Sequence, residues 1–246
     1  MIDLLQVDNI PKEDRACFFI AKVAHENAKG RKIVTWIRSA HFEKILKTYF
    51  NMTVSFGVSL RSEACDGKQV KQFNELSPKE HYLISLDRIY DKTVEKLLSD
   101  KGFNSIKDYV FLKHEPIILD NFNCKDGIYN DIYGNVINCP IGMNIKKIIF
   151  RGCGNRIIVK SGVTGAYNLT FDITSNTTIE LCDSSRFNST VKFEVFGHNG
   201  SAYIHIGERC RFTDAIFRLY TSPYNTAVII NSDCTFETHF EAHANT

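Results

Sequence analysis

The C-terminal part of the chain repeats a short apolar pattern, and this periodicity constrains the fold more than any other sequence feature. Each unit opens with an apolar, strand-like segment; the segments are Ile148–Phe150, Leu169–Phe171, Val191–Phe193 and Ala215–Phe217. A period of roughly 21 to 25 residues is typical of a supersecondary unit that stacks on copies of itself. The pattern therefore predicts a parallel β-helix over residues 141–246.

A second apolar pair and a lone apolar residue follow in each unit. The pairs are Ile157 with Val159, Ile179 with Leu181, Ile204 with Ile206, and Val228 with Ile230; the lone residues are Val163, Phe187, Phe212 and Phe236. Successive side chains of a strand point to opposite faces. His205, which lies between two isoleucines, is therefore expected to point away from the core. Cys210 and Cys234 occupy equivalent positions and are predicted to be small inward-facing residues rather than a disulfide.

The residues before the repeats alternate between helix-like and strand-like patterns. We expect helices over 12–29, 39–50 and 90–98, and strands over 32–37, 52–60, 81–86 and 109–112. This alternation predicts a small Rossmann-like parallel sheet, so the chain as a whole is α/β plus all-β. The expected divisions are an N-terminal helical segment (1–29), a Rossmann-like domain (30–118), a connector and cap (119–140) and the β-helix (141–246).

A parallel sheet binds ligands beyond the carboxyl ends of its strands, which directs attention to residues 35–41. This loop contains no glycine, whereas a dinucleotide pyrophosphate needs glycines for close backbone approach. Dinucleotide binding is therefore not expected. Arg38 and Ser39 could hold a sugar or a phosphate at the start of the next helix. The alternative is a surface arginine beside a serine that only caps the helix.

Composition excludes several other classes of function. A formal net charge of +2 gives no electrostatic reason to expect nucleic acid as a partner. No apolar run is long enough to span a membrane. The eight cysteines show no C-x-x-C pair and no zinc-type spacing, so no metal is predicted and a reduced, cytoplasmic location is expected.

The repeats carry a resemblance to a known family. The segment Gly154–Val159, with its later copies Asn176–Leu181 and Ser201–Gly207, resembles the hexapeptide repeats of left-handed β-helix acyltransferases. The similarity is to the members that act in bacterial surface-polysaccharide biosynthesis, and the entrance to the repeats, Tyr129–Asn135, is similar as well. Members of the broader group place a small Rossmann-like domain before the helix. The units here are longer than the regular coil of that family.

The resemblance implies a CoA-dependent enzyme that transfers an acetyl group from acetyl-CoA to a sugar of a surface polysaccharide. It favours a left-handed coil for the β-helix, and it implies a homotrimer with sites between subunits and a histidine as general base. The segment Ile230–Phe236 resembles the one that precedes this histidine in the family, and His239 and His243 are the histidines that follow it here. They are the predicted catalytic residues. His198, in a turn, is a predicted substrate-binding residue together with Arg38 and Ser39.

Two alternatives remain open at this stage. A right-handed β-helix that cleaves polysaccharide needs two carboxyl groups across the scissile bond. The carboxylates available on neighbouring units are Asp172, Glu180, Asp183, Glu194, Glu208, Asp214 and Asp233. A non-catalytic carbohydrate-binding or assembly module is the other alternative, since aromatic residues of the repeats could form an interface. Phe193 and Phe217 fit the core better, because both lie in the repeating apolar register.

Overall fold

The computed structural model describes residues 10–36, 38–59, 70–86, 92–112, 114–196, 201–220, 225–236 and 241–244. The chain divides into two compact units. The first, which we call the α/β unit, comprises residues 17–115. The second, which we call the repeat unit, comprises residues 1–16 and 116–246.

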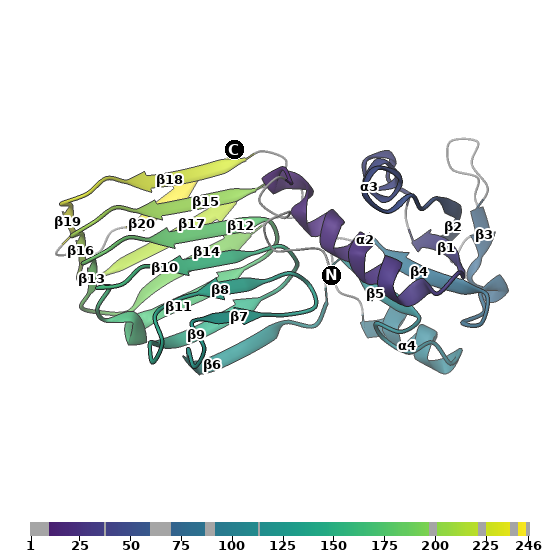
Figure 1. The fold of residues 1–246 in the computed structure, drawn as a ribbon, viewed down its shortest axis with the longest axis horizontal. Coiled ribbons are helices and arrows are strands. Elements are labelled where there is room, and N and C mark those ends of the chain that lie inside the picture. The colour runs from purple at the N-terminus through teal and green to yellow at the C-terminus, as the bar shows by residue number, and fades with distance from the viewer. Residues whose placement is uncertain are drawn as a thin grey trace. The chain divides into compact units, whose positions relative to one another are not determined.

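A five-stranded parallel sheet lies within the α/β unit (Figure 1). Its strands follow the order β3-β2-β1-β4-β5. Their bounds are β1 Lys32–Trp36, β2 Val54–Ser59, β3 Val70–Gln72, β4 His81–Ser85 and β5 Tyr109–Phe111. Every side chain of β4 and β5 is buried, as expected for strands of a parallel sheet that is covered on both faces.

Helices accompany the sheet where apolar residues recur at helical spacing. They are α2 Arg15–Ala28, most of which lies in this unit, α3 Ala40–Phe50, η2 Phe73–Glu75 and α4 Lys92–Asp100. The short helix η1, Lys12–Asp14, belongs to the repeat unit. Helix α3 begins after Ser39 and ends at Asn51, whose φ of 51° is left-handed. Its buried face comprises Phe42, Ile45, Leu46 and Phe50. The α-helices and the strands β1, β2, β4 and β5 lie where the sequence pattern predicts them, within a few residues.

Strand β3 is an element that the sequence pattern did not predict. It adds to the edge of the sheet, where Gly57 of β2 lies opposite Val70. The strand is only three residues long. Its sequence, Val70-Lys71-Gln72, contains a single apolar residue and so gives no apolar pattern by which a strand is recognised.

Three sheets make up the repeat unit, and successive repeats contribute strands to each of them (Figure 1). Sheet I has the order β20-β17-β14-β11-β9-β6, sheet II has β18-β15-β12-β10-β8-β7, and sheet III has β13-β16-β19. The elements are β6 Ile117–Asn123, β7 Ile128–Asn130, β8 Val136–Asn138, β9 Asn144–Phe150, β10 Arg156–Val159, η3 Ala166–Asn168, β11 Leu169–Ile173, β12 Thr177–Leu181, β13 Arg186–Phe187, β14 Val191–Phe196, β15 Ala202–Ile206, β16 Arg211–Phe212, β17 Ala215–Tyr220, β18 Thr226–Ile230, β19 Thr235–Phe236 and β20 Glu241–Ala244.

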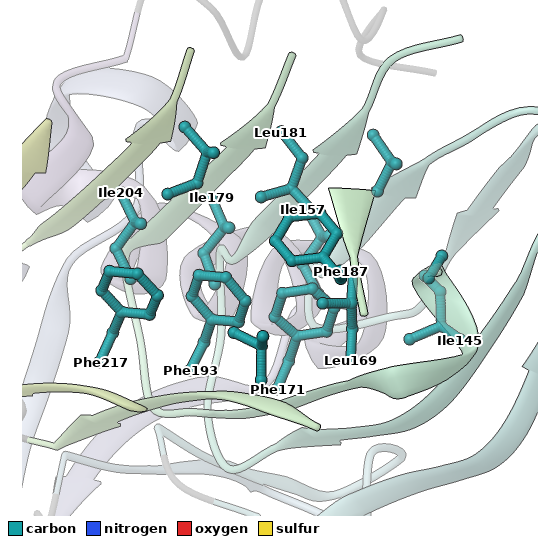
Figure 2. Packing of buried hydrophobic residues seen from close by; sticks show 14 of the residues in the cluster. Ile145, Ile157, Leu169, Phe171, Ile179, Leu181, Phe187, Phe193, Ile204 and Phe217 are labelled. Atoms are coloured by element: carbon teal, nitrogen blue, oxygen red, sulfur yellow. The ribbon is translucent and has the colours of Figure 1, made fainter. Parts of the chain in front are cut away.

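Equivalent residues of successive repeats lie next to one another in these sheets. Phe171, Phe193 and Phe217 are partners in sheet I, and their ring centroids stack 5.0 and 4.9 Å apart. Figure 2 shows these rings facing a row of isoleucines from sheet II that includes Ile179 and Ile204. Both rows are fully buried, so each repeat covers the apolar surface of its neighbours.

The predicted register is confirmed for sheet II and for the later repeats of sheets I and III. In the first repeat it is wrong by two residues. Phe171 lies opposite Ile148 rather than Phe150, and Arg186 bridges to Thr164, which displaces Val163 from the position of Phe187. A shift of two residues keeps the same side chains on the inner face, so the apolar pattern alone does not detect it.

The first strands of sheets I and II run against the rest. Among the described strands, β6 pairs antiparallel with β9 and β7 pairs antiparallel with β8, whereas strands of successive repeats pair in parallel. Residues of the N-terminus also contact the repeats. The Asn176 side chain accepts the backbone N–H of Ala16 at 2.7 Å and donates to the carbonyl of Glu13 at 3.1 Å.

The fold class is confirmed at the level of a mixed α/β region followed by a β-rich region whose sheets are mostly parallel. Of the helices in the described ranges, none is long and apolar enough to cross a membrane.

Candidate functional site

Arg38 and Ser39 lie together at the start of helix α3, and both make local contacts. The Arg38 guanidinium donates from Nε to Glu43 Oε1 at 2.8 Å. The Ser39 hydroxyl accepts the backbone N–H of Phe42 at 3.3 Å, which caps the helix. The contacts fit the alternative of an arginine beside a capping serine. Their role in substrate binding remains a prediction.

The predicted histidines of the repeats lie at the limits of the described structure. His198 and His239 are outside the described residues. His243 lies on β20, where its backbone is opposite Arg218 of β17; its side chain is also outside the described part. The catalytic role predicted for His239 and His243 therefore remains a prediction.

Arginines hold three of the carboxylates that polysaccharide cleavage would need. Arg151 binds both oxygens of Asp172, at 2.6 and 2.8 Å. Glu194 accepts a hydrogen bond from Arg218 Nε at 2.8 Å, and Asp233 accepts two hydrogen bonds from Arg209. The hydrogen bonds from Arg209 lower the pKa of Asp233. A glycosidase acid needs a raised pKa instead, so these pairs do not favour cleavage.

A different group of polar side chains gathers on the outer face of sheet II. The inward residues of β12 and β15, such as Ile179 and Ile204, are fully buried. The residues between them alternate to the other face, so the side chains of Glu180 and His205 are 24 and 28% exposed. The two residues lie directly opposite each other in the parallel register. The prediction that His205 points away from the core is confirmed.

Hydrogen bonds fix the orientation of the His205 ring. Its Nδ1 lies 3.1 Å from Glu180 Oε2 and 3.3 Å from the hydroxyl of Tyr203. That hydroxyl donates to the same Glu180 oxygen at 3.1 Å. The carboxylate thus binds one ring nitrogen, which leaves Nε2 directed to the other side.

The Cys182 thiol lies on that other side. It follows the last residue of β12, and its Sγ lies 3.9 Å from His205 Nε2. The backbone N–H of Cys182 donates to the carbonyl oxygen of Ile206 at 2.9 Å. This hydrogen bond holds Cys182 beside β15. Carboxylate, imidazole and thiol are therefore lined up across two neighbouring strands. We call Glu180, Cys182, Tyr203 and His205 the outer-face cluster.

Charges around the outer-face cluster favour a protonated thiol. Burial raises the pKa of Cys182, the Glu180 carboxylate raises it further, and Lys160 acts in the opposite direction. Lys160 Nζ lies 3.9 Å from Glu180 Oε1. Burial and the hydrogen bond to Glu180 also raise the pKa of Tyr203, and Lys12 Nζ lies 4.3 Å from the centre of its ring.

This arrangement suits proton transfer, because a neutral imidazole whose Nδ1 binds a carboxylate presents a basic Nε2. The cluster also contains three kinds of metal ligand. Glu180, Cys182 and His205 each offer one ligand atom, and these three atoms lie within 4.8 Å of one another. The sequence predicts no metal, because it has no zinc-type spacing of cysteines and histidines; Cys182 and His205 are 23 residues apart along the chain.

The repeat alignment contains the signal that finds the cluster. Aligning Ile179 with Ile204 places Glu180 next to His205, and parallel pairing makes such residues spatial neighbours. Neither residue is recognised by its own sequence neighbours, so the pair is not predicted from local patterns. The position of Cys182 just beyond the strand end follows from the same alignment.

No family model, curated protein or solved structure matches the chain.

Proposed function

We propose that the protein transfers an acetyl group from acetyl-CoA to a sugar of a bacterial surface polysaccharide or its precursor. The support is the resemblance of the repeats to hexapeptide-repeat acyltransferases, together with an imidazole oriented by a carboxylate on the outer face of sheet II. The contact between His205 Nδ1 and Glu180 Oε2 at 3.1 Å is the observation that carries the proposal.

The proposal extends to the fold and the assembly. We propose that the repeat unit is a parallel β-helix, because successive strands pass through sheets I, II and III in a repeated order. Its left-handed coil is proposed from the resemblance of the repeats alone. The α/β unit would be a Rossmann-like domain that helps to hold the acceptor, and the chain would act as a homotrimer in the cytoplasm. The free thiols of the described cysteines are in keeping with a reducing location.

His205 would act as general base on the acceptor hydroxyl. Its Nε2 takes the hydroxyl proton while the sugar oxygen attacks the thioester carbonyl carbon. The tetrahedral intermediate then expels the CoA sulfur, which receives that proton from the imidazolium. Glu180 stabilises the imidazolium through Nδ1, and Tyr203 fixes the carboxylate by donating to it.

Two measurements test the proposal. Calorimetry with acetyl-CoA and CoA measures binding of the co-substrate. Mass spectrometry of a panel of hexoses and amino sugars, incubated with acetyl-CoA and the protein, measures transfer. His205→Ala is expected to lower kcat by about 100-fold or more, the usual contribution of a general base. Glu180→Gln is expected to lower it less, because the imidazole remains.

Control variants separate the two possible bases. His25→Ala, at an exposed position of helix α2, should leave transfer unchanged. The double variant His239→Ala with His243→Ala tests the C-terminal histidines. Loss in this double variant, with full activity in His205→Ala, would move the base to the C-terminal segment. Absence of acetyl-CoA binding to the folded chain would remove the proposal.

A non-catalytic binding module is the second candidate, and one observation favours it. Ile229 of β18 lies opposite His205 and is 61% exposed. Its apolar side chain stands beside the hydrogen-bonding groups of His205, and a surface that binds a ligand without catalysis needs apolar and polar groups side by side. Sugar binding by the panel without any binding of acetyl-CoA would support this candidate instead.

A further inference from the structure

We propose that Glu180, Cys182 and His205 form a binding site for a zinc ion on the outer face of sheet II. The three side chains offer a carboxylate oxygen, a thiol sulfur and an imidazole nitrogen within 4.8 Å of one another. Three different donors at this separation come from two neighbouring strands, β12 and β15, whose register holds Glu180 opposite His205.

The separations are close to those that zinc requires. Zinc binds nitrogen and oxygen at about 2.0 to 2.2 Å and sulfur at about 2.3 Å, so tetrahedral ligands lie roughly 3.3 to 3.8 Å apart. Cys182 Sγ lies 3.9 Å from His205 Nε2, and one ligand atom from each of the three residues lies within 4.8 Å of the others. The 3.1 Å contact of Glu180 Oε2 is with Nδ1, the other ring nitrogen, so the carboxylate must turn towards Nε2 for the three residues to share an ion. Rotation of partly exposed side chains by about 1 Å brings the three donors around one ion.

The donor set selects the type of metal. Magnesium and calcium prefer ligand sets made only of oxygen, which this cluster cannot supply. Thiolate and imidazole together suit zinc, and a carboxylate is an accepted third ligand. Three protein ligands leave a fourth position for water, which is the arrangement of a reactive rather than a purely structural zinc ion.

Neighbouring groups are placed to support the ligands. The Tyr203 hydroxyl donates to Glu180 Oε2 at 3.1 Å and restricts the rotation of that carboxylate. Such outer contacts orient metal ligands and usually change metal affinity by about 10- to 100-fold. A divalent ion also compensates the negative charges of Glu180 and an ionised Cys182, a role that Lys160 fills only in part from 3.9 Å.

The zinc site does not rest on the proposed acyl transfer. A bound ion would occupy the imidazole that acts as base in that reaction, so the two uses of His205 exclude each other at any one time. Metal binding is therefore measured without acetyl-CoA or sugar, and failure of either proposal is seen without reference to the other.

The test uses the full chain, freed of metal and kept reduced. Zn²⁺ binding is measured by competition with a chromophoric chelator, and Co²⁺ is added as a spectroscopic probe, because a thiolate ligand gives a sulfur-to-cobalt charge-transfer band. We expect one ion per chain and this band. Cys182→Ser and His205→Ala should each weaken Zn²⁺ binding by at least about 100-fold, since they remove direct ligands.

Matched controls account for the other thiols and for folding. Cys234→Ser changes another partly buried thiol and should leave both signals unchanged. Tyr203→Phe should weaken binding by about 10-fold through loss of its hydrogen bond to Glu180. Circular dichroism confirms that each variant is folded. Unchanged Zn²⁺ affinity in a folded Cys182→Ser and His205→Ala double variant would overturn the inference, as would the absence of a sulfur-to-cobalt band in the wild-type chain.

Discussion

The α/β unit and the repeat unit bury the same kinds of apolar side chain, but they pair them differently. In the α/β unit neighbouring rings meet at tilted or steep angles; Phe18 and Phe50 meet at 39°, and Trp36 and Phe73 meet at 65°. In the repeat unit like residues stack, as Phe187 and Phe212 do at 5.2 Å and 12°. Each position of the α/β unit therefore has its own environment, whereas a residue of the repeat unit shares one with its counterparts.

Buried polar groups show the same contrast. The α/β unit places one guanidinium, that of Arg31, against Asp108 at 2.6 Å. The repeat unit passes amide hydrogen bonds from one repeat to the next. Asn155 Nδ2 donates to Asn135 Oδ1 at 2.9 Å, and Asn155 Oδ1 accepts the N–H of Thr177 at 3.0 Å. In the α/β unit one side chain thus collects several contacts, whereas in the repeat unit amide hydrogen bonds connect each repeat to the next.

The largest expected effect tests whether the two units unfold independently. Phe193→Ala removes a fully buried ring between Phe171 and Phe217, which should cost about 3 to 5 kcal/mol of stability. The single tryptophan, Trp36, lies in the α/β unit, and its fluorescence reports that unit alone. We expect the denaturation midpoint measured by circular dichroism to decrease, while the midpoint measured by tryptophan fluorescence does not change. A coincident shift of both would show one cooperative structure.

Arg31→Ala is the corresponding test of the α/β unit. The side chain donates to Asp108 and also to the carbonyls of Ala28 and Pro78. Its removal leaves the buried Asp108 without its cation and should cost about 3 kcal/mol. The tryptophan midpoint should fall this time. Arg38→Ala, which breaks a more exposed pair with Glu43, is the matched control and should cost less than about 1 kcal/mol.

Acid should weaken the α/β unit through the same contact. Burial raises the pKa of Asp108, but hydrogen bonds from Asn104 and Arg31 and the charge of Arg31 outweigh it, so the pKa lies below its ordinary value. A carboxyl group whose pKa is lower in the folded than in the unfolded state stabilises the folded state at pH values above its unfolded pKa. This stabilisation is lost as the pH falls through the pKa of the folded state. The denaturation midpoint detected by tryptophan fluorescence should therefore stay constant near neutral pH and should decrease when the pH is lowered below about 4. Asp108→Asn should be less stable at neutral pH and should show a weaker fall.

Much of this contrast was predictable from local patterns. The capping serine and the apolar face of helix α3 are visible in the sequence, and the isoleucines of sheet II recur at equivalent positions of successive repeats. The two-residue error in the first repeat arose because Ile148 and Phe150 both point inward, so either fits the pattern. The outer-face cluster was missed for a different reason. Polar outward residues carry no periodic signal, and only the register of the isoleucines brings Glu180 and His205 together.

The smallest expected effect concerns Ser39, a predicted substrate-binding residue. Ser39→Ala removes the hydroxyl that accepts the Phe42 N–H and should cost about 1 kcal/mol in the tryptophan-detected transition. Ser55→Ala, an exposed position of β2, is the control and should change little. If Ser39 only caps the helix, acetyl transfer should be unaffected. A raised KM for the sugar with unchanged stability would assign the hydroxyl to the substrate.

The stacked phenylalanines of sheet I have a consequence for how such a chain can diversify. Phe171 and Phe193 are 22 residues apart and Phe193 and Phe217 are 24 apart, yet their ring spacings are 5.0 and 4.9 Å. The segments between strands absorb the difference in length. Insertions there leave the interior undisturbed, so during evolution the outer surface can acquire new loops and new specificities while the same core is inherited.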